Sequence, residues 1–337
     1  MAAVSKHIQV SAAPGRQWYS LAAAIGLAIP VVALAQAPQY PTRPIRMIVP
    51  LAAGGTTDIV ARLVGQRLNE AFGQAVVVDN RPGGGTTIAA ALAARAAPDG
   101  YTLLFHSVSI ATTVPLYPNL PYDPLKAFAA ISPVAQSFYV VAVHPSVPVN
   151  SVKELIALAK SKPKQVTLAH AGTGTITHLT VENFMAQAGI QLLLVPYKGG
   201  APALAALVSG QVQTIFNPIA EILPQVRAGG KVRTLAVTSP ERAPELPDVP
   251  TLAELGYPGA TVTTRNGLYA PAGTPRAIIT KLNGEINRMV NSPEAKERFR
   301  SLGLVARGGT PEELDEYVRS EVARWTKVVK EAGIKIN

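Results

Sequence analysis

Short β-branched runs alternate with longer helical patterns along most of this 337-residue chain, and this alternation most limits how the chain can fold. The alternation starts at residue 45 and begins again at residue 166. The strand-like runs are mostly apolar and rich in β-branched residues, and they lie at residues 45–49, 76–78, 101–105, 166–169, 192–195, 212–216 and 232–237. Strands of this kind are buried on both faces, as in parallel sheets covered by helices. The sequence therefore predicts an α/β fold with two doubly wound lobes.

Two further extended runs, 137–144 and 262–270, lack the glycine-rich turn and the following helix of the other runs. Each lies next to one end of the second set of strands. We therefore expect them to be crossover strands that connect the lobes. The predicted division assigns residues 40–140 and 262–337 to lobe 1, and residues 141–261 to lobe 2.

Helix-start signals are clear in the C-terminal segment. Thr274 and Ser292 each precede a proline, the arrangement of an N-cap followed by proline at the first helical position. Thr310 and Glu313 form a capping-box pattern at the start of a long amphipathic stretch. Its apolar stripe includes Trp325, which we expect to pack in the core.

The N-terminus has the parts of a secretory signal. Lys6 and Arg16 precede an apolar run at 21–35, and small residues stand at Ala33 and Ala35. A run of 15 residues is short for a membrane span, which needs about 20. We predict a signal peptide over residues 1–35, cleaved near Ala35, and a periplasmic product. An uncleaved N-terminal anchor is the alternative.

Composition excludes several classes of function. The net charge of +10 comes from 31 Lys and Arg against 21 acids, spread without a run of five like charges. Nucleic acid is therefore not expected as a partner, because such proteins present a basic stripe or arm. The chain has no cysteine, which excludes disulfides, thiolate metal sites and cysteine nucleophiles. No cofactor is predicted.

The loop at residues 50–58 is the first candidate binding element. Gly54 and Gly55 let the backbone approach a ligand, and a helix starting near Thr57 offers unpaired N–H groups. Such a helix start suits a carboxylate or phosphate. The alternative is a tight turn with Thr56 or Thr57 as N-cap. Asp58 can be a first-turn residue favoured by the helix dipole.

Two further glycine-rich loops precede helices. The loop at 80–87 is better explained as a structural turn than as a contact. The loop at 171–178 is close to a dinucleotide fingerprint, but Thr177 replaces its third glycine and no acid follows at residues 195–199. A helix start with the Thr173 and Thr175 hydroxyls, holding a small anion, fits this loop better than a nucleotide does.

Signatures of catalysis are missing from the sequence. The chain has no G-x-S-x-G elbow, no phosphate-binding loop with a lysine, and no H-E-x-x-H pair. His170 and His178 can meet across the third loop, although metal binding is not predicted there. We predict places that hold an anion and no catalytic residues.

Taken together, seven segments in order resemble one family: PLAAGGTTDIVAR, VVVDNRPGGGTTIAA, APDGYTLLF, AGTGTITHLTVENF, VPYKGGAPALAALVSGQV, VRTLAVTSPERAPELPDVPTLAELGY and GLYAPAGTP. The family is the substrate-binding proteins of tripartite tricarboxylate transporters, also called the Bug or TctC family. The resemblance implies a type II periplasmic-binding-protein fold, with a ligand cleft between two lobes joined by two crossover strands. It also implies a ligand that is a di- or tricarboxylate, an acidic amino acid or an aromatic acid.

Matched to this chain, the resemblance places the ligand against the first loops of both lobes. The predicted ligand-binding residues are Leu51, Ala53, Gly54, Gly55, Thr56, Asp58, Ser107, Thr173, Gly174, Thr175, His178, Tyr197 and Asn217. His106 and Ser109 are further candidates for the distal end of the ligand, and Arg265 is a weaker one. Lys198 is expected to be solvated; its recruitment by a second ligand carboxylate is the alternative.

The chain also departs from the family pattern. The family often has an aromatic residue where Leu51 stands, Ser where Thr175 stands, and Asp where Gln213 and Asn217 stand. If Asn217 faces the cleft, its neutral amide removes a partner for an ammonium group, which favours a ligand without an amino group.

The resulting prediction is a solute-binding protein that captures a carboxylate by lobe closure and delivers it to the permease subunits of such a transporter. A monomer is expected. A periplasmic sensor for a signalling partner, or a secreted enzyme on the same scaffold, are the alternatives.

Overall fold

The structure is a computed structural model, and it describes residues 1–12 and 40–335. Residue contacts divide the chain into two units, Met1–Gln39 and Tyr40–Asn337. The described residues of the first unit, 1–12, contain no helix or strand. The apolar run at 21–35 and the predicted cleavage near Ala35 lie outside the described residues. Within the described ranges, none of the helices combines the length and apolarity needed to cross a bilayer.

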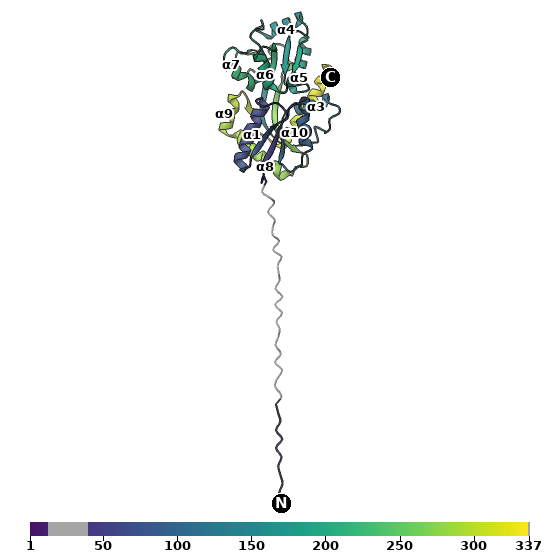
Figure 1. The fold of residues 1–337 in the computed structure, drawn as a ribbon, viewed down its shortest axis with the longest axis vertical. Coiled ribbons are helices and arrows are strands. Elements are labelled where there is room, and N and C mark those ends of the chain that lie inside the picture. Colours follow the sequence, from purple (N-terminus) through teal and green to yellow (C-terminus); the bar gives the residue numbers. More distant parts are fainter. Residues whose placement is uncertain (13–39, 336–337) are drawn as a thin grey trace. The chain divides into compact units, whose positions relative to one another are not determined.

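One mixed sheet organises the second unit (Figure 1). Its strands are β1 (Ile45–Val49), β2 (Val76–Asn80), β3 (Thr102–Ser107), β4 (Phe128–Val143), β5 (Thr167–His170), β6 (Leu193–Pro196), β7 (Thr214–Pro218), β8 (Arg233–Val237), β9 (Thr263–Pro271) and β10 (Val305–Ala306). Their order is β2-β1-β3-β9-β4-β7-β5-β6, and β8 and β10 also pair with β4. The pairs β1–β2, β1–β3, β5–β6 and β5–β7 are parallel. The seven predicted strands all form, with ends within two residues of the predicted ones.

The long strand β4 joins the two parts of the sheet. Residues 128–138 pair antiparallel with β9, whereas residues 139–143 pair antiparallel with β7. We call β2, β1, β3 and β9 with residues 128–138 the first half of the sheet, and the remaining β4 residues with β5–β8 the second half. The predicted crossover at 262–270 corresponds to β9. The one at 137–144 covers only the second part of β4, which begins at Phe128.

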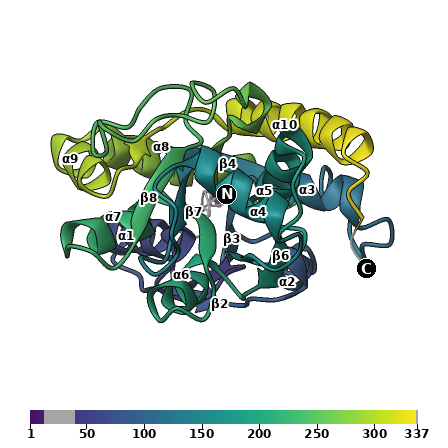
Figure 2. The same cartoon turned by 90° about the horizontal axis from the view of Figure 1, so that it is seen from above.

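Helices cover both halves of the sheet. They are α1 (Thr56–Phe72), α2 (Thr87–Ala94), α3 (Ser109–Leu116), α4 (Val152–Ser161), α5 (Ile176–Ala188), α6 (Gly200–Val208), α7 (Ile219–Arg227), α8 (Arg276–Asn291), α9 (Pro293–Ser301) and α10 (Pro311–Glu331), with short 3₁₀ turns at Gly84–Thr86 and Pro258–Ala260. In Figure 1, α4–α7 gather at one end of the sheet, and α1, α8 and α10 lie at the other. Figure 2 shows α8, α9 and α10 along one border of the view.

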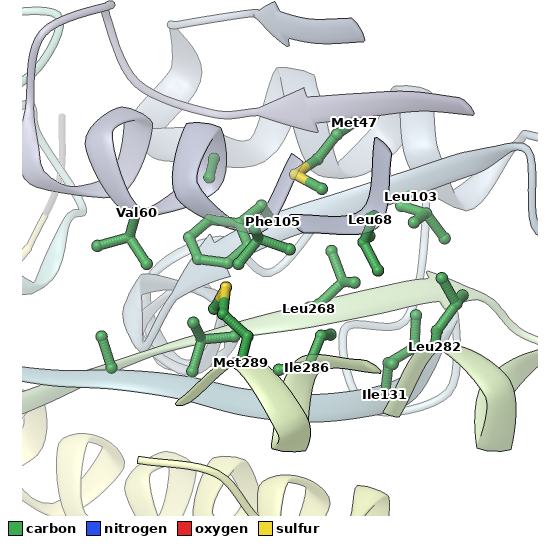
Figure 3. Close-up of a cluster of buried hydrophobic side chains, with 14 of the residues drawn as sticks. Met47, Val60, Leu68, Leu103, Phe105, Ile131, Leu268, Leu282, Ile286 and Met289 are labelled. Carbon is green, nitrogen blue, oxygen red and sulfur yellow. The ribbon is translucent and has the colours of Figure 1, made fainter. Parts of the chain in front are cut away.

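A buried apolar cluster anchors α1 and α8 to the first half of the sheet (Figure 3). Helix α1 places Val60, Val64 and Leu68 four residues apart, so that all three face the sheet and are fully buried. They pack in one cluster with Phe105 of β3 and Met289 of α8. Burying an aliphatic side chain of this size stabilises the fold by about 1.5–3 kcal/mol. This core fixes where α1 begins, and its first turn belongs to the candidate site.

The predicted caps in the C-terminal segment are partly confirmed. Thr310 and Glu313 form a capping box at the start of α10, and Ser292 caps α9 by accepting from the backbone of Ala295. Trp325 is fully buried, as predicted. The prediction for Thr274 is wrong, because α8 begins at Arg276 and the Thr274 hydroxyl instead donates to the carbonyl oxygen of Pro271 at 2.8 Å.

Candidate functional site

A small cavity lies where the first turns of five helices, α1, α3, α5, α6 and α7, come together with β4 and β9 in the described part of the chain. Its volume is about 40 Å³, which is space for about three water molecules. The lining residues are Leu51, Gly55, Thr56, Thr57, Ser107, Ser109, Ser137, Tyr139, Ala171, Thr175, Ile176, Thr177, Gly200, Pro218, Glu221, Thr264 and Asn266. Both halves of the sheet therefore contribute to one cavity.

The electrostatic character of this cavity comes from the backbone. Among its lining residues there is no lysine, arginine or histidine, and Glu221 is the single carboxylate. Most of the other polar groups are hydroxyls. Helix N-termini carry unpaired N–H groups and a partial positive charge, so their convergence favours an anion without any cationic side chain.

Asp58, in the first turn of α1, fixes the loop before this helix through hydrogen bonds. The Asp58 carboxylate is buried and accepts hydrogen bonds from the Gly54 N–H (2.9 Å), the Asn80 amide (3.0 Å) and the Arg62 guanidinium (2.9 Å). Burial alone would raise the pKa of Asp58, but these hydrogen bonds outweigh burial and hold that pKa below its usual value. Gly54 has a φ of +82°, which favours glycine. The alternative with Thr56 or Thr57 as N-cap is wrong, because Gly55 occupies the N-cap position.

The first turn of α1 carries a carboxylate from α7. Oε1 of Glu221 accepts from the Thr56 backbone N–H at 2.7 Å and from the Thr56 hydroxyl at 2.9 Å. Oε2 accepts from the Asn217 amide at 2.9 Å. Burial raises the pKa of Glu221, against the opposing effect of these three hydrogen bonds. Both Glu221 oxygens accept hydrogen bonds, the arrangement that suits an ionised carboxylate, so one end of the cavity already holds a carboxylate of the protein itself.

The first turn of α5 carries only neutral groups. The Ile176 N–H donates to the Ser109 hydroxyl at 3.2 Å. The Thr177 hydroxyl accepts from the Ala171 N–H at 3.1 Å and lies 2.9 Å from the Thr175 hydroxyl. Gly174, with φ of +85°, lets this loop pass against the ring of Tyr117. This end of the cavity offers N–H and hydroxyl donors without a bound charge.

Strands β4 and β9 contribute the remaining polar wall. Burial raises the pKa of Tyr139, so its hydroxyl stays neutral. The Asn266 amide donates to the Thr57 hydroxyl at 3.3 Å. Within the described residues, the buried Thr264 hydroxyl makes no hydrogen bond of ordinary geometry, although it lies close enough to the Tyr139 hydroxyl to oppose the raised pKa of that group.

Three histidines lie close to this region without lining the cavity. His170 and His178 stack with ring centroids 4.8 Å apart, and Nδ1 of His178 accepts from the Gly174 N–H at 3.3 Å. Burial, reinforced by the neighbouring His178, lowers the pKa of His170 to about 3. Burial lowers the pKa of His106 to about 4. His106 and His170 are therefore neutral at pH 7 and support the loops structurally.

Five of the predicted ligand-binding residues lie in the cavity lining: Leu51, Gly55, Thr56, Ser107 and Thr175. Thr173 and Tyr197 line a neighbouring hollow, which shares Leu51 and Thr175 with the cavity.

The other predicted residues lie around the cavity without lining it. Ala53 and Gly54 are exposed on the first loop, whereas Asp58, Gly174 and His178 make hydrogen bonds that hold the loops. Asn217 is fully buried behind Glu221.

Sequence reasoning missed Glu221, and the wall residues Tyr139, Thr264 and Asn266. A signal for Glu221 was present in the sequence. It stands in the first turn of the helix that follows the predicted strand at 212–216, where a parallel sheet brings the strand ends and helix starts to one edge. Its neighbours Ile219, Ile222 and Leu223 are apolar, so an acid among them is unusual.

The family of the chain follows from a direct match. The model of the tripartite tricarboxylate transporter family receptor, TctC, matches residues 60–334. The chain belongs to this family. Its members are periplasmic solute-binding proteins and not enzymes.

Known relatives support the same conclusion over most of their length. The chain is 37% identical to BugT of Bordetella pertussis over 316 residues, which is 93% of this chain and 95% of BugT. Two solved structures are similar as well. Rpa4515 of R. palustris with adipate has a TM-score of 0.85 and 37% identity, over 88% of this chain and 99% of that one.

The second solved structure is MatC from Rhodopseudomonas palustris with bound malate. It has a TM-score of 0.82 and 34% identity, over 86% of this chain and 100% of that one. Together with the sheet topology, these matches give the chain the type II periplasmic-binding-protein fold, as the resemblance predicted.

Proposed function

We propose that this chain is an extracytoplasmic receptor that captures a small carboxylate and delivers it to a tripartite tricarboxylate-type permease. The observation that carries the proposal is the meeting of five helix starts around a cavity whose lining has no cationic side chain. Such a site suits a carboxylate, which backbone N–H groups and hydroxyls can hold without a neutralising lysine or arginine. The adipate and malate named for two similar structures support the same ligand class.

The ligand carboxylate binds at the start of α5 in this proposal. The Thr177 hydroxyl and the N–H groups of the first turn are its donors there. The Thr175 hydroxyl lines the site but already donates to the Gly172 carbonyl oxygen at 2.6 Å, so it can only accept. Leu51 and Gly55 of the first loop, with Ser107, contact the rest of the ligand. Aromatic acids and small aliphatic acids both remain candidates for it.

Capture occurs by closure of two lobes, 40–140 with 262–337 against 141–261. Contacts between the sheet halves support this step: Ala52 N–H donates to the Lys198 carbonyl at 2.9 Å, and the Thr112 hydroxyl donates to the Gly174 carbonyl at 2.7 Å. A ligand that touches both loops stabilises the closed arrangement and shifts the population toward it.

Residues 1–35 act as a cleavable signal peptide in this proposal, and the mature protein is periplasmic. Sequencing the N-terminus of the protein recovered from the periplasm tests this directly. We expect it to begin at Gln36. Retention of Met1 on a membrane-bound product would contradict cleavage.

The test of ligand class is thermal unfolding of the purified protein against carboxylates and their matched amides. The protein is first unfolded and refolded to remove any ligand that copurifies. A ligand at 100 times its dissociation constant adds about 2.7 kcal/mol, which raises the unfolding midpoint by several degrees. We expect a shift with at least one acid and none with its amide. Equal shifts with acid and amide would show that the cavity does not select an anion.

A further inference from the structure

The position of Glu221 divides the cavity into two unlike ends. Its side chain is only 7% exposed and reaches from the first turn of α7 to the first turn of α1. There it accepts two hydrogen bonds from Thr56, one from the backbone N–H and one from the hydroxyl. A carboxylate of the protein therefore already occupies the helix start that a second ligand carboxylate would need.

The surroundings are shaped for this carboxylate. A Cβ atom added at Gly200 would lie 2.3 Å from Oε2 of Glu221, and one added at Gly55 would lie 3.5 Å from Oε1. Only a residue without a side chain leaves room at Gly200. Asn217 approaches from behind and donates to Oε2. The carboxylate is thus packed on several sides.

The charge of Glu221 has no cationic partner in the cavity. Among the lining residues, the other polar side chains carry hydroxyls or, at Asn266, an amide. Its hydrogen-bond donors, Thr56 and Asn217, are neutral. A second negative charge brought near it meets repulsion that no cation in the cavity lining offsets. At the effective dielectric of a protein site, two like charges about 5 Å apart weaken binding by on the order of 100-fold.

We infer that Glu221 is a specificity-determining residue, which limits the cavity to ligands with one carboxylate, bound at α5, and rejects acids that bring a second carboxylate toward α1. The inference rests on the proposed carboxylate function and narrows it. It separates this chain from the similar structures named for adipate and malate, both of which are dicarboxylates. The end of the ligand that faces Glu221 is neutral.

The variant Glu221→Gln tests the charge with little change in shape. Its amide oxygen still accepts from Thr56. Its amide nitrogen replaces Oε2, and Asn217 can accept from it after rotating its own amide, because Oδ1 of Asn217 has no partner among the described residues. The matched control is Glu241→Gln, which removes the same charge from an exposed residue outside the cavity lining.

The probes are pairs of acids of similar length that differ by one carboxylate: butyrate and succinate, hexanoate and adipate, benzoate and terephthalate. Calorimetric titration at pH 7.5 gives the ratio of the two dissociation constants for each pair. We expect wild type to favour the monoacid. Glu221→Gln should shift the ratio toward the diacid by about 100-fold, whereas Glu241→Gln should leave it unchanged. A misfolded variant cannot gain affinity in this way.

Two outcomes would overturn the inference, and they are distinguishable. If wild type binds diacids as tightly as monoacids and Glu221→Gln leaves the ratio unchanged, Glu221 is not a filter and the carboxylate receptor stands. If folded wild type and Glu221→Gln bind none of the six acids, the carboxylate function fails and the inference fails with it.

Discussion

The starts of α1 and α5 are alike in sequence and different in what they hold. Both follow a parallel strand and a loop with two glycines, and both line the same cavity. The N–H of Thr56 at α1 bonds to the Glu221 carboxylate, whereas the N–H of Ile176 at α5 bonds to the Ser109 hydroxyl. One partner is charged and packed in place, and the other is a neutral hydroxyl. Two similar helix starts thus acquire different roles through one side chain each.

The two ends also respond to acid in opposite directions. Burial raises the pKa of Glu221 at the α1 end, so the folded protein binds that proton more strongly than the unfolded chain does. His170 beneath the α5 loop has its pKa lowered to about 3 from 6.5, so there the unfolded chain binds the proton more strongly. Protonation of Glu221 in acid therefore stabilises the folded state, whereas protonation of His170 destabilises it.

The largest effect is expected for Gly200→Ala, which tests whether the carboxylate is fixed at α1. The added Cβ meets Oε2 of Glu221 and forces the side chain to shift. We expect a loss of about 3 kcal/mol in the free energy of unfolding, measured by denaturant titration. In a Glu221→Ala background the same change should cost roughly half as much, because both Glu221 oxygens are absent and only Oδ1 of Asn217, 2.8 Å from the added Cβ, still crowds it. Equal costs in both backgrounds would show that Glu221 does not lie against Gly200.

The next effect concerns pH and sharpens the contrast between the two ends. Since the folded pKa of His170 lies below its ordinary value, stability is lost as the pH falls through 6.5, by about 2 kcal/mol at pH 5. His170→Asn removes this loss, and its Oδ1 can still accept from the Gly172 N–H. Glu221→Gln should instead make the loss of stability between pH 7 and pH 5 larger. It removes a carboxyl group whose raised pKa stabilises the folded protein as the pH falls.

The measurement is denaturant unfolding of wild type and both variants at pH 7 and pH 5. Protonation of His106 in acid also lowers the free energy of unfolding. Because this contribution is the same in all three proteins, only the differences between them are compared. If the free energy of unfolding of His170→Asn falls between pH 7 and pH 5 by as much as that of wild type, His170 is not the cause of the loss.

The alternation of strands and helices, and the two glycine loops, could be predicted because they depend on local patterns. The strand at 45–49 and the turns at Gly54 and Gly174 can each be predicted from a few adjacent residues. Glu221 could not be placed in this way, because its partner Thr56 lies 165 residues away. The contact exists only once the two halves of the sheet come together.

Two other elements are absent from the predicted set, for opposite reasons. The first part of β4 contains alanines and Pro133, which are poor strand formers, and its pairing with β9 shifts register on both sides of Ser132 and Pro133. Its strand structure is imposed by β9. Helix α4 had a sequence signal that was overlooked, since Ser151 caps it by accepting from the Glu154 N–H.

The smallest effect is expected for Ser109→Ala. This variant tests whether the Ser109 hydroxyl occupies, in the ligand-free protein, the position where a ligand oxygen accepts from the Ile176 N–H. Removing the hydroxyl leaves the Ile176 N–H without its partner, which costs about 1 kcal/mol when no ligand is present. A bound carboxylate would accept from that N–H in place of the hydroxyl. The increase in the free energy of unfolding on adding a saturating monoacid should therefore be larger in Ser109→Ala than in wild type.

The matched comparison for that experiment is Thr180→Val, which removes a buried hydroxyl of the same helix that lies outside the cavity lining. The Thr180 hydroxyl donates to the Ile176 carbonyl oxygen at 2.7 Å, a bond that a ligand at α5 does not replace. Added monoacid should rescue Ser109→Ala and leave Thr180→Val weakened. Loss of acid binding in Ser109→Ala would make the hydroxyl a ligand contact in its own right, and both helix starts would then hold their anions with help from fixed side chains.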